Sequence, residues 1–139
     1  METRRLNVET RRFRLAYLPW LLPIMLLVGA GPSTASIAIE DDVLRVKMGW
    51  FWFRATVPLR SIVHARRSAS SWFAVGVHTD MMRGWIVNGS PLGMVHLTIE
   101  SPADGRFAGL PIKVGNLWLS LEDPDAFLAA LTSANPGID

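Results

Sequence analysis

The sequence predicts a mainly β domain, a split barrel or sandwich of about seven strands, capped by a single C-terminal helix. Two observations predict the strands: apolar residues alternate with polar ones from Ser36 onward, and turn-forming residues separate the alternating runs. A third observation predicts the helix, because Asp123-Pro124-Asp125 supplies an N-cap, a proline at the first helical position and an acid in the first turn. A chain of 139 residues fits one domain that can bury its own core.

We divide the chain into a basic N-terminal arm at 1–14, an apolar segment at 15–35 and a β domain at 36–133. The capping helix is predicted at 124–133, where Phe127, Leu128 and Leu131 form one apolar stripe. This stripe must lie against apolar surface, and an open end of the β structure is the natural place for it.

The uncharged stretch at 15–32 is open to four interpretations. They are a segment packed in the fold, a membrane-spanning helix, a helix on a membrane surface, and the apolar part of a signal peptide with a cleavage site near 33–35. A span needs roughly 20 apolar residues, and Pro19 and Pro23 each remove a helix hydrogen bond. We expect the segment to pack in the fold and keep the other interpretations open.

The first strands form a hairpin. Residues 36–39 and 44–48 alternate in polarity on either side of the polar turn at 40–42. The aromatic run at 50–53 has high strand propensity, and Pro58 marks a sheet edge or a strand end because it cannot donate to a β-ladder.

Further strands are predicted at 72–77, 85–87, 94–100, 110–114 and 116–121, with a loop at 78–84 and turns at 88–89 and 101–105. The clearest alternation lies in 94–100. There Val95, Leu97 and Ile99 are predicted to point inward, while His96 lies on the polar face and is expected to be exposed.

Composition excludes several kinds of chemistry. Without cysteine the chain has no disulfide, no thiolate metal ligand and no cysteine nucleophile. His64, His78 and His96 lack metal-ligand spacing, and the sequence holds neither a Walker A motif nor a nucleophile elbow. We therefore expect no catalytic residues, no metal site and no cofactor, and we do not expect an enzyme.

Charge is distributed unevenly along the chain. Residues 1–67 hold eleven Lys or Arg against five Asp or Glu, whereas residues 68–139 hold three against seven. The basic half could face an anionic surface, although a solvated basic terminus explains the same counts. We do not expect nucleic-acid binding, because no known aromatic–basic motif is present.

Three short stretches resemble bacterial pleckstrin-homology-like domains. They are Leu44 to Gly49, Val57 to Ile62 with its I-P-L-x-x-I-like step, and Leu119 to Phe127 with its final strand and helix entry. The likeness covers roughly 36–131, and the sequence also resembles uncharacterised actinobacterial proteins of about this length. Fold resemblance alone does not transfer a function.

The resemblance implies a non-enzymatic binding or scaffold module, and a protein or peptide is its expected partner. Lipid-binding members of the group carry a basic cluster in the first hairpin loop. Here that loop, Glu40-Asp41-Asp42, is acidic, which argues against phosphoinositide binding of that kind. The alternative is a membrane-associated accessory protein anchored by 15–32, and a small-ligand carrier is the least favoured function. The expected compartment is the cytoplasm, with membrane association under the alternative.

Five residues are the candidate interaction residues: Arg66, Arg67, His78, Asp80 and Arg83. They lie in or beside the long polar connections of the predicted fold, where binding residues concentrate. The sequence leaves the oligomeric state undetermined.

Overall fold

The structure is a computed structural model that describes residues 11–17, 19–21, 23, 27, 35–49, 52–68, 76–79, 83–88 and 93–138. Its strands are β1 (Arg11–Phe13), β2 (Ser36–Glu40), β3 (Val43–Met48), β4 (Phe53–Pro58), β5 (Ile62–Arg67), β6 (Gly76–Thr79), β7 (Gly84–Asn88), β8 (Met94–Phe107) and β9 (Leu110–Ser120). The helices are η2 (Pro19–Leu21), η4 (Leu59–Ser61) and α2 (Pro124–Ala134). The predicted mainly β fold with a C-terminal helix is confirmed.

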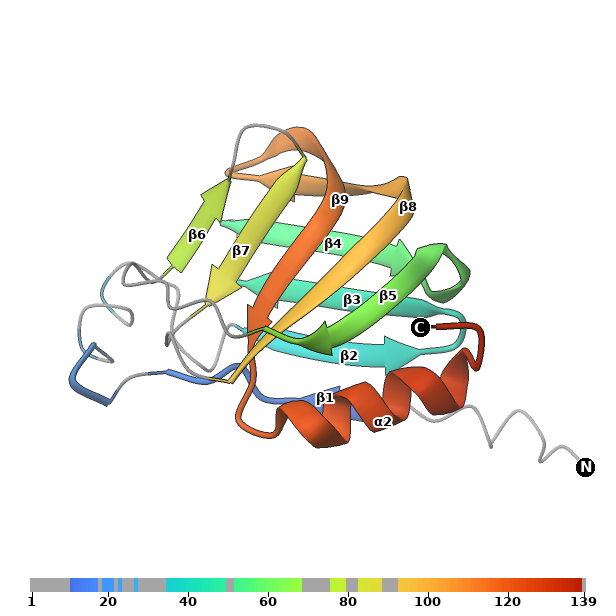
Figure 1. The fold of residues 1–139 in the computed structure, drawn as a ribbon. Helices are drawn as coiled ribbons and strands as arrows, with labels where there is room; N and C mark the ends of the chain where they lie inside the picture. Colours follow the sequence, from blue (N-terminus) through green and yellow to red (C-terminus); the bar gives the residue numbers. More distant parts are fainter. Residues whose placement is uncertain are drawn as a thin grey trace, which may run out of the picture.

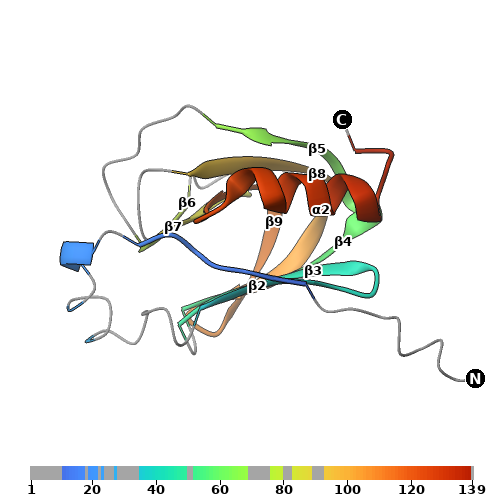
Figure 2. The same cartoon turned by 90° about the horizontal axis from the view of Figure 1, so that it is seen from below.

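The strands join in one sheet, in the order β1-β2-β3-β4-β8-β9-β7-β6, with β5 paired to β8 beside this path. Neighbouring strands are antiparallel, except that β7 and β9 run parallel. Figures 1 and 2 show that the sheet folds over into two layers, one built on β2–β4 and the other on β5, β7 and parts of β8 and β9. The predicted split barrel or sandwich therefore describes the architecture.

The long strands β8 and β9 connect the two layers. The first part of β8 pairs with β5, and its last residues, from Asp104 to Phe107, pair with β4. Between these parts the register with β9 shifts between Thr98 and Ala103. This interruption lets the strand bend from one layer into the other.

The turn predicted at 101–105 is wrong, because these residues belong to β8. Pro102 and Gly105 favour a turn in the sequence, but Pro102 lies where the ladder to β9 is interrupted and no N–H is needed. The loop predicted at 78–84 is also wrong at both ends. His78 and Thr79 pair with β7, and Gly84 is the first residue of that strand.

The core lies between the two layers and under the helix. In β8 and β9 the alternation is as predicted, since Val95, Leu97, Ile99, Leu117 and Leu119 are buried. Burial of these side chains from both layers supplies most of the stability of such a fold.

Helix α2 covers the open end of the β structure, as predicted. The Asp123 side chain accepts a hydrogen bond of 3.1 Å from the Ala126 N–H and so caps the helix. Phe127 and Leu131 are fully buried, and Phe127 meets Phe13 of β1 edge to face at 5.2 Å between ring centroids. At the other end Asn135 terminates the helix and donates to the Leu59 carbonyl at 2.7 Å.

The described strands number nine, against about seven predicted. One addition is β1, which comes from the basic arm and pairs with β2 from Arg11 to Phe13. Alternation could not reveal this strand, because its three residues are too few to show a period.

Only part of the apolar segment at 15–35 belongs to the described residues. Leu15 is 5% exposed and forms a bridge with Leu121, and Tyr17 packs against the core. Burial raises the pKa of the Tyr17 phenol above its ordinary value. Trp20 and Leu27 are 72% and 85% exposed. Packing of the whole segment in the fold therefore stays a prediction.

None of the helices that the structure describes is long and apolar enough to cross a bilayer.

Candidate functional site

Basic side chains gather on the outer surface of the layer that contains β3 and β4. Alternation places Met48, Phe53 and Ala55 in the core, so the residues between them point outward. We call this surface the basic face, and its residues are Glu40, Arg45, Lys47, Arg54, Thr56, Asp104, Arg106 and Lys113. Its five cationic side chains outnumber its two carboxylates, so the net charge of the basic face is positive.

Three cations of the basic face lie in one cross-strand row. Lys47 of β3 is directly opposite Arg54 of β4, and Arg54 is directly opposite Arg106 of β8. We call these three residues the basic row. The register therefore places three positive charges side by side across three strands.

The neighbouring row contains both signs of charge. Arg45, Thr56, Asp104 and Lys113 succeed one another across β3, β4, β8 and β9. Lys113 donates a hydrogen bond to Asp104, and this bond together with the ammonium charge lowers the pKa of the Asp104 carboxyl. Arg45 forms an ion pair of 3.4 Å with Glu40.

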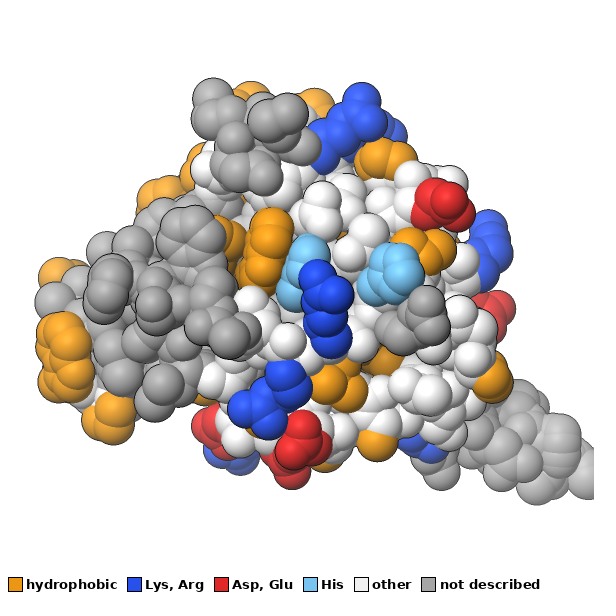
Figure 3. Space-filling view, in the orientation of Figure 1, with side chains coloured by type: hydrophobic (Ala, Val, Ile, Leu, Met, Phe, Trp, Pro, Cys, Tyr) orange, Lys and Arg blue, Asp and Glu red, His pale blue; other side chains and the backbone are white. Residues whose placement is uncertain are grey.

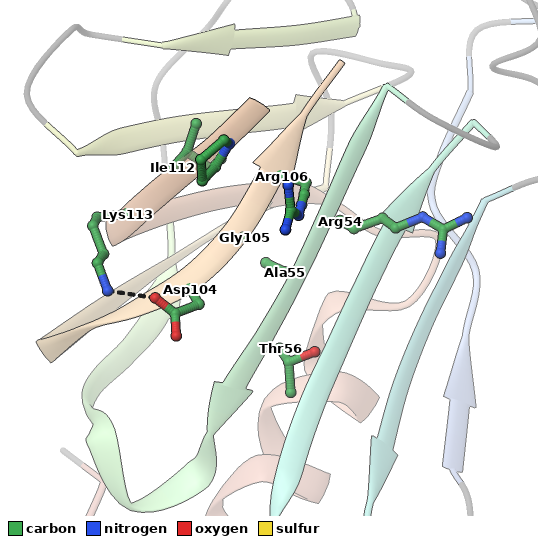
Figure 4. A pocket seen from close by; sticks show the side chains of 9 residues that line it. Arg54, Ala55, Thr56, Asp104, Gly105, Arg106, Ile112 and Lys113 are labelled. Atoms are coloured by element: carbon green, nitrogen blue, oxygen red, sulfur yellow. Dashed lines mark hydrogen bonds and ion pairs between the residues drawn. The ribbon is translucent and has the colours of Figure 1, made fainter. Parts of the chain in front are cut away.

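An open groove of about 600 Å³ lies between these two rows. Its lining consists of Arg54, Ala55, Thr56, Asp104, Gly105, Arg106, Pro111, Ile112 and Lys113. Figure 4 shows Asp104 and Lys113 paired at one side of this groove, whereas the Arg54 side chain extends away from Arg106.

Gly105 brings the two arginine-bearing strands together at this groove. A Cβ atom at Gly105 would lie 2.7 Å from the carbonyl oxygen of Arg54, which is closer than real Cβ contacts come. Glycine therefore permits the close approach of β4 and β8 beside the position where Arg54 and Arg106 are partners in the register.

The groove can bind an anion, because guanidinium and ammonium groups donate charge-assisted hydrogen bonds to oxyanions. Arg106 also donates to the Gly109 carbonyl at 3.0 Å, which holds its side chain at the β8–β9 hairpin. Ordinary general acid–base catalysis would need a base or nucleophile beside the bound group. Asp104 is the one carboxylate in the groove lining, and Lys113 already binds it.

The opposite outer surface, over β5, β8 and β9, carries a different set of side chains. The register places Arg66 opposite His96, and His96 opposite Trp118. We call these three residues the aromatic row. The rings of His96 and Trp118 are stacked, with centroids 4.3 Å apart and planes 5° apart. A hydrogen bond of 2.9 Å joins His96 Nε2 to Asn116 Oδ1.

Figure 3 shows histidine and arginine side chains side by side on this surface. His64 and Arg66 are exposed, whereas His96 is half-buried instead of exposed as expected. The stack on Trp118 and the bond to Asn116 explain the difference, since they cover the His96 ring on two sides.

The structure does not bring together the predicted interaction residues whose backbone it describes, which are Arg66, Arg67, His78 and Arg83. Arg66 and Arg67 are exposed on β5, not in a connection, and Arg67 forms an ion pair of 3.1 Å with Asp125 at the start of α2. The backbone of His78 belongs to β6, which three strands separate from β5. Strands are spaced about 5 Å apart, so the two places are about 20 Å distant.

Arg83 and Asp80 complete this set. Arg83 adopts a positive φ of 77° before β7, and its carbonyl oxygen accepts hydrogen bonds from the N–H groups of Gly115 and Asn116 at 2.7 and 3.2 Å. This backbone role is structural. Asp80 lies outside the described residues.

The residues of the basic face are not among those predicted from the sequence. Alternation alone could have placed Lys47 and Arg54 on outward positions of adjacent strands. It could not have added Arg106, because the turn predicted at 101–105 hid the pairing of β4 with the end of β8.

Within the described ranges, no three His, Asp or Glu side chains are grouped as metal ligands would be. No family model matches the chain, and neither the curated proteins nor the solved structures include a match.

Proposed function

We propose that this chain is a non-enzymatic binding module of pleckstrin-homology-like type that docks an acidic segment of a protein partner on its basic face. The basic row carries the proposal. Lys47, Arg54 and Arg106 lie directly opposite one another in the register, so the row concentrates positive charge. An acidic segment of a partner would complement this charge.

The shape of the groove supports a peptide as the partner. A groove of about 600 Å³ lies within the range of sites that hold small ligands or a few side chains. It is open to solvent, and outward side chains of adjacent strands, among them Thr56, Asp104 and Lys113, contribute to its lining, so an extended segment can lie in it. The expected compartment of such a module is the cytoplasm.

A labelled oligo-glutamate peptide tests the proposal by fluorescence anisotropy with the full chain. We expect binding that weakens as salt is added, because exposed charges are screened. Arg54→Glu should weaken binding about tenfold, since it reverses the charge at the centre of the basic row. The new carboxylate would face Lys47 and Arg106, and thermal denaturation checks that the variant keeps its fold.

Arg66→Glu is the matched control, because it makes the same change of net charge on the opposite surface. This variant should keep its affinity within about twofold. Equal losses in the two variants would show that net charge governs binding, and absence of binding to the unmodified chain would refute the proposal.

A further inference from the structure

The hairpin between β8 and β9 ends in residues without a polar side chain. The sequence at 107–112 is Phe-Ala-Gly-Leu-Pro-Ile, and it lies between Arg106 and Lys113. We call 107–112 the apolar tip. Its residues at 108–111 are exposed, and Leu110 is 65% exposed. Turns are ordinarily built from polar residues, glycine and proline, so this tip differs from an ordinary solvated turn.

The tip remains apolar at a conformational cost. Ala108 and Gly109 both have a positive φ, of 51° and 84°, as a two-residue hairpin turn of type I′ requires. Asparagine and aspartate are common at the first of these positions because they tolerate a positive φ, which alanine rarely adopts. An apolar side chain therefore occupies a position that favours a polar one.

Hydrogen bonds within the molecule satisfy backbone groups of the tip. The Ala108 N–H donates to the Trp52 carbonyl at 3.0 Å, and the Gly109 carbonyl accepts from the Arg106 guanidinium at 3.0 Å. Pro111 has no N–H. The hydrocarbon of a bilayer offers no water to backbone groups, so bonds made inside the protein lower the cost of burying the tip there.

The tip and the acidic turn at 40–42 lie at opposite ends of one layer. The register joins Phe107 to Phe53, and Phe53 to Met48 at the end of β3. The acidic turn precedes Val43, at the start of the same strand. Given the rise of a strand per residue, the two ends are about 17 Å apart.

Positive charge accompanies the tip at its base. The bond from Arg106 to the Gly109 carbonyl holds the guanidinium beside the turn, and an arginine has several N–H donors that can reach lipid phosphates. Asp104 is the one carboxylate in the sequence of the hairpin from 103 to 114, and Lys113 pairs with it. Apolar side chains beside cations are typical of segments that enter an anionic membrane surface.

A second exposed apolar side chain lies at the same end of the molecule. Trp20 of η2 is 72% exposed. Figures 1 and 2 both show η2 (blue) at the end where the β8–β9 hairpin (orange) turns. Tryptophan is enriched at the interface between lipid and water, so η2 fits as a further contact with the same surface.

We infer that the apolar tip docks the domain on an anionic lipid bilayer, with Leu110 among the acyl chains and Arg106 at the headgroups. Insertion removes the exposed leucine from water, while the guanidinium stays at the level of the phosphates. In this orientation the acidic turn at 40–42 points away from the negative surface. The inference goes beyond the proposed function, because Leu110 does not line the groove of the basic face.

A bilayer fits the apolar tip better than a protein partner does. A stable protein interface buries about 800 Å² on each side and involves about 20–30 residues of each partner. The apolar tip is six residues long and charged residues flank it, so it offers much less apolar area. A fluid bilayer needs no complementary pocket, and a few exposed apolar side chains can enter it.

The chain contains no cysteine, so a single introduced thiol can carry a label. Leu110→Cys labelled with nitrobenzoxadiazole should become brighter on vesicles of phosphatidylcholine and phosphatidylglycerol in equal parts. Lipids with a nitroxide on the acyl chain should quench this signal. Arg60→Cys places the same label in η4, which follows Pro58 at the end near the acidic turn, and its signal should not change.

Vesicle co-sedimentation of the unlabelled chain measures affinity. Leu110→Ser should weaken binding about tenfold, because the apolar side chain that inserts is lost, whereas Leu110→Phe should keep it. Ala108→Asn should raise the melting temperature, since asparagine suits the turn, and yet weaken vesicle binding. Arg106→Gln should weaken binding to the mixed vesicles, whereas Arg60→Gln makes the same change of net charge at the other end and should not.

Two results would overturn the inference. One is a label at position 110 whose fluorescence ignores the vesicles, and the other is vesicle binding that Leu110→Ser leaves unchanged. A complex between two copies of the chain that Leu110→Ser dissociates without lipid would show that the tip is a protein interface instead. Leu110→Ser should still bind the oligo-glutamate peptide, so failure of the inference leaves the proposed function standing.

Discussion

The two outer surfaces of this domain are built from the same long strands and yet differ in how their side chains are satisfied. On the aromatic row, His96 stacks on Trp118 and bonds to Asn116, so the polar groups of this surface stabilise one another. On the basic row, Lys47, Arg54 and Arg106 lie directly opposite one another in the register, so charges of one sign share a row. One surface joins its polar groups across strands, and the other gathers cations.

The bend of β8 produces this contrast. Its first half contributes His96 to one surface, and its last residues contribute Arg106 to the other. A change on the aromatic row should therefore affect stability, and a change on the basic row should affect binding.

The largest effect is expected at Trp118. Truncation of a buried tryptophan costs about 3–5 kcal/mol, and Trp118 is half-buried, so Trp118→Ala should lower the free energy of unfolding by about 2 kcal/mol. Chemical denaturation measures this value. Binding of the oligo-glutamate peptide should persist in the folded fraction, because Trp118 lies on the surface opposite the basic row.

Trp118→Phe is the control for the stack. It keeps an aromatic ring against His96 and should recover much of the lost stability. If the alanine variant were as stable as the original chain, the aromatic row would have no structural role. The comparison between the two surfaces would then fail.

The strands and the capping helix could be predicted because the sequence patterns that indicate them involve residues close together in the chain. Asp123 and Pro124 specify the start of α2, and alternation specifies which residues of β8 and β9 are buried. The path of β8 could not be predicted. Pro102 and Gly105 indicate a turn locally, whereas pairing with two different strands keeps the segment extended.

The candidate site was harder to predict than the fold, because it depends on register. Arg54 and Arg106 are 52 positions apart in the sequence, and only the pairing of β4 with β8 brings them together. The residues chosen from the sequence, such as Arg66 and His78, were selected for polar surroundings. Polarity places a residue on the surface but does not indicate which strand lies beside it.

A smaller effect is expected at Lys47, where the comparison can be sharpened. Like charges opposite each other cost about 0.2–1 kcal/mol, so Lys47→Gln should raise the free energy of unfolding by about 0.5 kcal/mol at low salt. The gain should shrink as salt screens the repulsion from Arg54. Denaturation at two salt concentrations measures both values.

Arg66→Gln is the corresponding change on the other surface. It removes a positive charge, but the residue directly opposite Arg66 is His96 and not a second lysine or arginine. It should leave stability nearly unchanged at either salt concentration. A loss of stability in the Lys47 variant would mean that Lys47 stabilises the fold. The basic row would then need no ligand to account for it.

The smallest effect concerns Asp104, whose carboxyl pKa is lowered by the hydrogen bond and the charge of Lys113. A pKa below the unfolded value of about 3.9 means that the folded state favours the carboxylate. Its contribution to stability is therefore present above the unfolded pKa and is lost as the pH falls through the folded pKa. Because the pair is exposed, the change in stability should be slight.

A carboxyl NMR titration of Asp104 measures this pKa directly. Lys113→Met removes both the donor and the charge, so the pKa should return to the ordinary range of an aspartate. Lys47→Met removes a cation from the same face but not from Asp104, and it should leave this pKa low. If both variants raised the pKa equally, the positive field of the whole face would hold Asp104 ionised. The neutral wall of the groove would then not exist, and the division of this face into a basic row and a paired row would have to be abandoned.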